Sequence, residues 1–109
     1  MIFSFDQMEE TVIPHFKGGE QEVAARMYAD ALNRIMRATL KPGASIGMHT
    51  HDAGSEIVYV LQGNATVVEE TGETVLSAGM CHYCPKGGSH SIINRSGEDL
   101  VLFAVVPNQ

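Results

Sequence analysis

The chain has 109 residues and a formal net charge of −6, from 7 Lys and Arg against 13 Asp and Glu. This length fits one domain with one modest core. The acidic balance would repel a nucleic-acid phosphate backbone or an anionic membrane surface, so neither is expected as a partner.

The N-terminal residues 1–10 have neither a basic leader nor a sustained apolar run, and they do not read as a signal peptide. No apolar run approaches the roughly 18 residues of a membrane helix. Cys81 and Cys84 are too sparse for a disulfide scaffold, which favours a reduced compartment. We therefore expect a cytoplasmic protein.

Turn signals recur roughly every 8 to 12 residues and separate short β-rich runs, a pattern typical of an all-β sandwich or barrel. Residues 1–30 are expected to form an N-terminal arm. Within it, residues 19–30 are the only segment with helix-forming composition, and they are compatible either with a helix or with a strand that starts near Arg26.

Residues 32–41 alternate in polarity and predict a half-buried strand, with Arg34, Met36 and Ala38 on one face. Residues 57–61 and 100–106 are apolar at nearly every position, which predicts cover on both faces. In so small a β protein, a second sheet or a second subunit would supply that cover.

Metal-ligating residue types cluster in the middle of the chain. His49 and His51 are two residues apart, so on a strand their imidazoles project to the same side and can share one ion. The turn sequence at 52–55 reverses the chain, so Glu56 can open the next strand facing back toward the pair. His90 follows another turn. Imidazole with carboxylate suits Mn, Fe, Ni, Cu or Zn, and the alternative is a set of solvated or hydrogen-bonded side chains.

The spacing of these residues resembles the two motifs of the cupin family. The first motif runs Gly43, five residues, His49, one, His51, four, Glu56, six, Gly63. The second runs Gly79, five residues, Pro85, one, Gly87, two, His90, three, Asn94. Both motifs are complete, and together they cover residues 43–94, about half of the chain.

The resemblance implies one cupin domain over residues 1–109: a double-stranded β-helix, that is, a small jelly-roll barrel, with motif 1 at 43–63 and motif 2 at 79–94. It implies a homodimer, and it implies that His49, His51, Glu56 and His90 bind one divalent transition metal at the barrel centre. Asn94 is expected to hydrogen-bond at a turn or strand end.

The lining of the barrel decides the chemistry, because one fold supports many reactions. We expect Arg34 to be a buried cation near the metal that binds a substrate carboxylate, with a surface ion pair as its alternative. His82 and Cys84 share a strand face and can line the pocket or orient a ligand. Cys81 and Cys84 face opposite ways, which argues against a shared zinc site.

The sequence therefore predicts a metal-dependent cupin acting on a small oxygenated, anionic organic molecule, in a dioxygenase, decarboxylase, isomerase or lyase type of reaction. The alternative is a non-catalytic cupin module that binds a metabolite or sugar.

Overall fold

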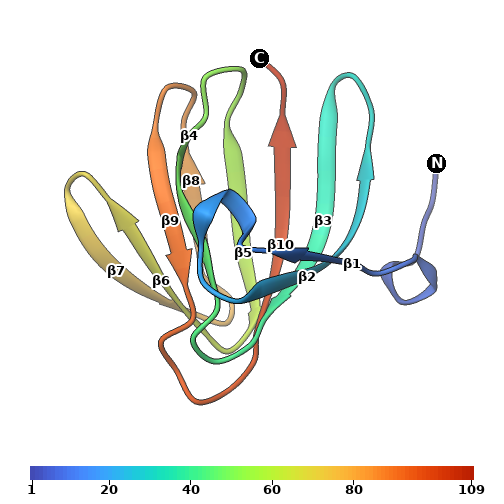
Figure 1. Ribbon diagram of the computed structural model, residues 1–109. Coiled ribbons are helices and arrows are strands. Elements are labelled where there is room, and N and C mark those ends of the chain that lie inside the picture. Colours follow the sequence, from blue (N-terminus) through green and yellow to red (C-terminus); the bar gives the residue numbers. More distant parts are fainter.

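Ten strands and two short 3₁₀ helices form the fold in the computed structural model, which describes residues 1–109 (Figure 1). In chain order they are η1 (Phe5–Gln7), β1 (Thr11–Pro14), η2 (Phe16–Gly18), β2 (Glu22–Ala29), β3 (Asn33–Leu40), β4 (Ser45–Thr50), β5 (Glu56–Gln62), β6 (Asn64–Glu69), β7 (Gly72–Ser77), β8 (Cys81–Cys84), β9 (Ser89–Ile93) and β10 (Leu100–Pro107). The prediction of an all-β jelly roll is confirmed.

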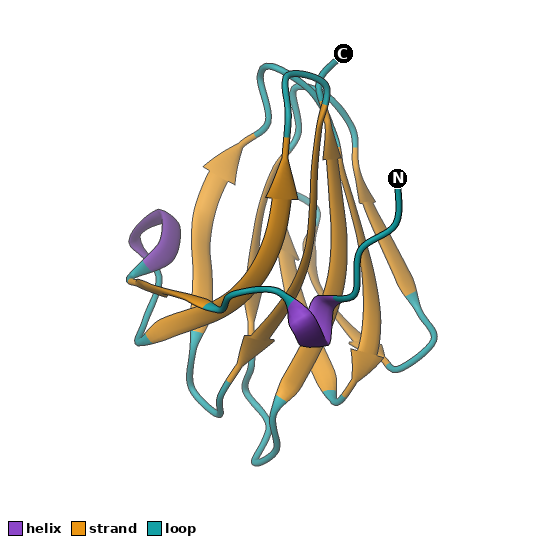
Figure 2. Ribbon diagram, turned by 90° about the vertical axis from the view of Figure 1, so that its right-hand side faces the viewer, coloured by secondary structure: helices purple, strands orange, loops and turns teal.

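The strands form two antiparallel sheets that face each other. The larger sheet has the order β1-β2-β3-β10-β5-β8, and the smaller has the order β4-β9-β6-β7. From β3 onward the chain passes repeatedly from one sheet to the other, and Figure 2 shows the two layers with their strands running along the same long direction. This back-and-forth path brings the end of β4 and the starts of β5 and β9 together at one end of the barrel.

The segment with helix-forming composition is not a helix. Residues 22–29 form β2, which pairs with β1 on one side and with β3 on the other. Val23 and Ala25 point into the core, so tertiary pairing overrides the weak helical preference of the segment. Two strands within the expected N-terminal arm, β1 and β2, are therefore part of the larger sheet.

The strand predicted at residues 32–41 is β3, and its alternation matches the burial. Met36, Ala38 and Leu40 are at most 4% exposed, and they belong to a core of 16 buried apolar residues between the sheets. Burying each large apolar side chain contributes about 1.5 to 3 kcal/mol. Arg34 lies on the same inward face, but at the end of the strand, where it is exposed.

Cover on both faces is not found for β5. Its inward residues Val58 and Val60 are buried, but Ile57, Tyr59 and Leu61 are 39%, 39% and 46% exposed on the outer face. The outer face of β10 is better covered, because Phe5 of η1 packs edge-on against Phe103. The expected two-sided burial of residues 57–61 is thus wrong for the chain on its own.

A glycine makes the crossing between the sheets at the end of the first motif. Gly63 has a φ of +85° between β5 and β6, and a side chain there would overlap the carbonyl of Asp99. Asn94 closes the second motif: its buried amide donates to the carbonyls of Leu40 and Glu98, and its oxygen accepts from the backbone N–H of Ser96. The expectation that Asn94 is a hydrogen-bonding residue is confirmed.

Neither of the two short helices, nor any other segment, forms a helix with the length and apolar character that crossing a bilayer requires.

Candidate metal centre

Three histidine side chains and one carboxylate converge at one end of the barrel. His49 lies on β4, His51 follows that strand, Glu56 begins β5 and His90 lies on β9. The β4–β9 pairing puts His49 directly opposite His90, while the turn at 52–55 returns the chain so that Glu56 faces them. The structure therefore brings together the four residues that the motifs single out.

The donor atoms are spaced like the ligands of one ion. The Nε2 atoms of the three histidines lie 3.1 to 3.2 Å from one another. Oε1 of Glu56 lies 2.8 Å from Nε2 of His90, 3.1 Å from Nε2 of His51 and 3.9 Å from Nε2 of His49. Ligands at right angles around an ion about 2.1 Å away are about 3.0 Å apart. The five separations of 2.8 to 3.2 Å fit such angles, and the 3.9 Å between His49 and Glu56 is close to the roughly 4.2 Å between two ligands on opposite sides of the ion.

The hydrogen bond of His49 fixes its tautomer, so that Nε2 presents its unshared electron pair to the other three donors. Its Nδ1 lies 2.7 Å from the carbonyl oxygen of Gly47, which can only accept, so Nδ1 holds the proton and donates. Nε2 of His49 is then an acceptor that faces the carboxylate of Glu56, which is also an acceptor. Two acceptors that face each other are satisfied by a shared cation, and the donor set therefore fits a divalent transition metal.

Electrostatics favour the ligand forms of these groups. In the metal-free protein burial by itself would raise the pKa of Glu56, but protonated imidazoles beside it outweigh burial, and the pKa is lowered to about 2. Burial lowers the pKa of His51, which favours its neutral form. A carboxylate and neutral imidazoles are the protonation states that bind a metal.

A cavity of about 230 Å³ reaches three of the four donors, His49, His51 and Glu56, and residues of both sheets and of η2 line it. It is smaller than the roughly 300 Å³ at the low end of pockets for drug-sized ligands, so it suits a small molecule. Its charged residues besides Glu56 and the histidines are Lys17, Asp30, Arg34 and Asp52. The carboxylate of Asp30 accepts from the backbone N–H groups of Leu32 and Asn33 in its own loop.

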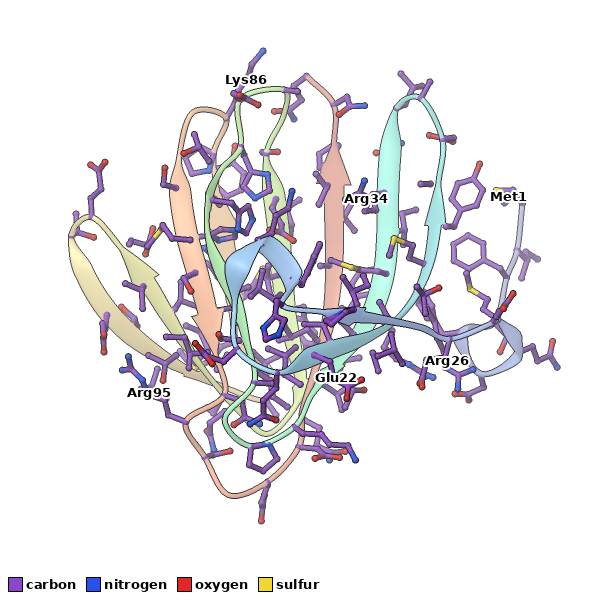
Figure 3. All side chains as sticks on the ribbon, in the orientation of Figure 1. Met1, Glu22, Arg26, Arg34, Lys86 and Arg95 are labelled. Atoms are coloured by element: carbon purple, nitrogen blue, oxygen red, sulfur yellow. The ribbon has the colours of Figure 1, made fainter.

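Arg34 lines this cavity, but it is exposed at the mouth and not buried as expected. No acidic side chain lies within ion-pair distance of it, so the alternative of a surface ion pair is not found either. Figure 3 shows Arg34 in the upper half of the view, with Lys86 higher and to its left, while Arg26 and Arg95 lie in the lower half.

His82 and Cys84 do not line the cavity. Both are buried on the inward face of β8, and the exposed Cys81 and Tyr83 alternate with them, as the strand period predicts. Nε2 of His82 lies 2.9 Å from Nδ1 of His90, on the side of that ring away from the other donors. His82 therefore contacts a candidate ligand rather than the cavity.

Sequence reasoning missed Phe16 and Lys17, which line the mouth. They reach it because the backbone of η2 packs directly on β4: a side chain at Gly47 would overlap the carbonyl of Lys17, and one at Gly19 would overlap that of Ser45. The signal in the sequence was Gly19, in a Gly-Gly turn of the N-terminal arm, together with Gly47, two residues before the first histidine. It does not by itself say which two segments approach each other.

Comparison with known proteins places the chain in a family. The profile of the cupin domain family matches residues 36–106. The chain is 30% identical to a protein of Thermotoga maritima named oxalate-binding protein, over 97% of this chain and 93% of that one.

Solved structures show the same fold. A predicted oxalate decarboxylase from Thermotoga maritima superposes with a TM-score of 0.93 at 28% identity, over the whole of both chains. A sugar phosphate isomerase from Silicibacter pomeroyi superposes over all of this chain and 76% of that one, with a TM-score of 0.83 at 19% identity, which is a likeness of fold alone. On the match to the family profile and the extent of these similarities, the chain belongs to the cupin domain family.

Proposed function

We propose that this cupin is a metal-dependent enzyme that acts on a small anionic molecule with adjacent oxygen donors, and that oxalate is the first substrate to test. The observation that carries the proposal is the convergence of three imidazole nitrogens and one carboxylate oxygen, about 3 Å apart, at the inner end of a small cavity with unpaired cations at its mouth. His49, His51, Glu56 and His90 would hold the metal. A bound divalent ion polarises an oxygen ligand or lowers the pKa of a bound water.

The charges of the cavity support an anionic substrate. With a divalent ion bound, the ion, Lys17 and Arg34 carry four positive charges, against three negative charges on Asp30, Asp52 and Glu56. Asp30 is already engaged by backbone N–H groups of its own loop. Arg34 presents a planar set of donors that matches a carboxylate. These residues of the chain would therefore bind and orient the anion.

The alternative function is binding without turnover, and the relative named oxalate-binding protein favours it. The decarboxylase reading rests on a similar structure that is itself described as predicted. Both readings share the metal centre and the anion, and they differ only in whether a product forms. The substrate, the reaction and the native metal among Fe, Mn, Ni, Zn and Cu are therefore decided by assay. The proposed location is the cytoplasm, where the free thiols of Cys81 and Cys84 would stay reduced.

The first experiment measures metal content and oxalate chemistry together. Untagged protein purified without chelator is analysed by elemental mass spectrometry beside His49→Ala, and we expect near one equivalent of one metal that is lost in the variant. The loaded protein is then assayed for oxalate binding by calorimetry and for release of CO₂ and formate. Product that disappears in His51→Ala supports the enzyme, and binding without product supports the module. Trace metal in both proteins would contradict the proposal.

Arg34 provides a test that is specific to the anion. We expect Arg34→Ala to weaken oxalate binding about 10- to 100-fold, because a hydrogen bond to a charged group contributes about 1.5 to 3 kcal/mol. Arg95→Ala is the matched control, since Arg95 pairs with Glu73 outside the cavity. Titration calorimetry measures both. Equal affinities in the Arg34 and Arg95 variants would remove Arg34 from the binding site.

A further inference from the structure

Behind the four donors lies a fourth imidazole that the proposed chemistry does not use. His82 of β8 is 8% exposed, and it touches His90, which is fully buried, through a contact of 2.9 Å between Nε2 of His82 and Nδ1 of His90. The two rings are 5.1 Å apart between centroids. His90 is thus held between the donor cluster on one edge and His82 on the other.

The proton on His90 can occupy only one position when a metal is bound. A ligand nitrogen must present its electron pair, and Nε2 of His90 is the atom that faces His49, His51 and Glu56. The proton is then on Nδ1, where it donates to Nε2 of His82. His82 must accept with Nε2 and carry its own proton on Nδ1. The contact therefore selects one tautomer of each ring.

His49 shows the same arrangement with a backbone partner, because its Nδ1 donates to the carbonyl of Gly47. Ligating histidines generally donate their second nitrogen to such a group, and this fixes the ring and raises its basicity. The partner of His90 is a side chain, so substitution can test its contribution.

A second metal bound by His82, Cys84 and His90 is the competing interpretation, because their ligand atoms also lie within 4.8 Å of one another. A neutral imidazole has one electron pair, so His90 cannot ligate two ions through its two nitrogens without losing its last proton. The first centre offers three further donors including a carboxylate, whereas the second offers one imidazole and a thiol whose pKa is raised by burial. His90 therefore belongs to the first centre.

We propose that His82 is a positioning residue, which holds the ring and the tautomer of His90 in the form that binds metal. The inference rests on the metal centre of the proposed function. His82 touches no substrate and binds no metal. Its loss acts on metal affinity through His90 alone.

The test compares His82→Leu with His82→Gln in metal-stripped protein titrated with Co²⁺. Leu fills much of the volume without an acceptor, while the amide oxygen of Gln can accept from Nδ1 of His90. We expect the Leu variant to bind Co²⁺ about 10- to 100-fold more weakly and with an altered visible spectrum. The Gln variant is expected to recover most of the affinity and the native spectrum. Circular dichroism checks that both variants fold.

The other results overturn the inference in distinguishable ways. A Leu variant that binds Co²⁺ like the native protein would refute the positioning role of His82 and leave the metal centre intact. Equal losses in the Leu and Gln variants would show a packing role instead. Two equivalents of Co²⁺ in the native protein, with the second lost in Cys84→Ser, would establish the second metal site. Native protein that binds no Co²⁺ would overturn the metal centre and this inference together.

Discussion

Glu56 illustrates how single residues of this site are set for metal binding by their surroundings. Its side chain is 5% exposed, and a carboxylate this buried would ordinarily be driven toward its neutral form. The neighbouring imidazoles reverse that effect and bring its pKa to about 2. His51 and His82 change in the complementary sense, because burial lowers the pKa of each. Acid release of a bound metal should therefore follow the imidazoles and not the carboxylate.

For the metal-free protein, we expect the melting temperature to fall as the pH drops below 6.5. In the unfolded chain His51 and His82 have the ordinary pKa of 6.5, and in the folded protein their pKa values lie lower. The unfolded chain therefore binds protons first, so this stability is complete above pH 6.5 and is lost as the pH falls toward the folded pKa values.

Thermal unfolding of chelator-treated protein between about pH 8 and about pH 5 measures this effect, at pH values above the range where most carboxylates titrate. The control is the double variant His51→Gln, His82→Gln, which should show a flatter dependence on pH. An unchanged slope in the double variant would assign the acid sensitivity to other groups.

At the scale of elements, the contact between η2 and β4 connects the start of the chain to the site. Gly47 takes part twice: its carbonyl accepts from His49, and its lack of a side chain leaves room for the backbone of Lys17. Ser45 stabilises the contact between β4 and the segment that follows η2. Its backbone N–H donates to the carbonyl of Glu20, and its hydroxyl accepts from the N–H of Glu20. The position of Lys17 at the mouth thus depends on β4.

Gly47→Ala should therefore weaken both the fold and the mouth of the site. The added methyl group overlaps the carbonyl of Lys17, so η2 has to move away from β4. We expect a loss of about 1 to 3 kcal/mol in unfolding free energy, as for other overpacked positions, together with weaker oxalate binding. Denaturant unfolding and calorimetry measure the two effects. Gly97→Ala is the control, because a methyl group there meets nothing within 4 Å; equal stability of the two variants would contradict the prediction.

The parts of the site that the sequence predicts are those built from local spacing. His49 and His51 share a strand face, and one turn separates them from Glu56, so strand period and turn chemistry suffice to place them. Lys17 depends instead on the approach of η2 to a strand almost thirty residues later, which periodicity does not encode. The composition of residues 19–30 left a helix and a strand open for the same reason, because pairing with β1 and β3 decides for the strand and sets its start at Glu22.

At the scale of the whole molecule, one outer surface remains apolar. We call it the β5–β8 face, and its residues are Ile57, Tyr59, Leu61 and Tyr83. Ile57 pairs with Tyr83 across the two strands, so these side chains adjoin. Strand β8 is also the edge of the larger sheet and pairs only with β5. The apolar pattern of residues 57–61 predicts cover on both faces, but the pattern is the same whether that cover comes from the same chain or from another.

We propose that a second copy of this chain packs against the β5–β8 face. The chain has a net charge of −6, and a face without charged members is where two such copies approach with the least repulsion. A two-fold axis would also bring the two copies of the edge strand β8 together, and closed two-fold dimers are the commonest protein oligomers. Light scattering after gel filtration should then give twice the chain mass of 11.8 kDa.

Tyr83→Asp should convert that dimer into a monomer, because it buries two carboxylates of like charge in an apolar interface. Val75→Asp is the matched control: Val75 is 60% exposed, as Tyr83 is 57% exposed, but it lies on β7 of the smaller sheet. The same light-scattering measurement decides between the outcomes. A native mass of one chain would refute the dimer. A Tyr83→Asp variant that keeps the mass of two chains would place the interface elsewhere, and dissociation in the Val75 variant alone would move it to the smaller sheet.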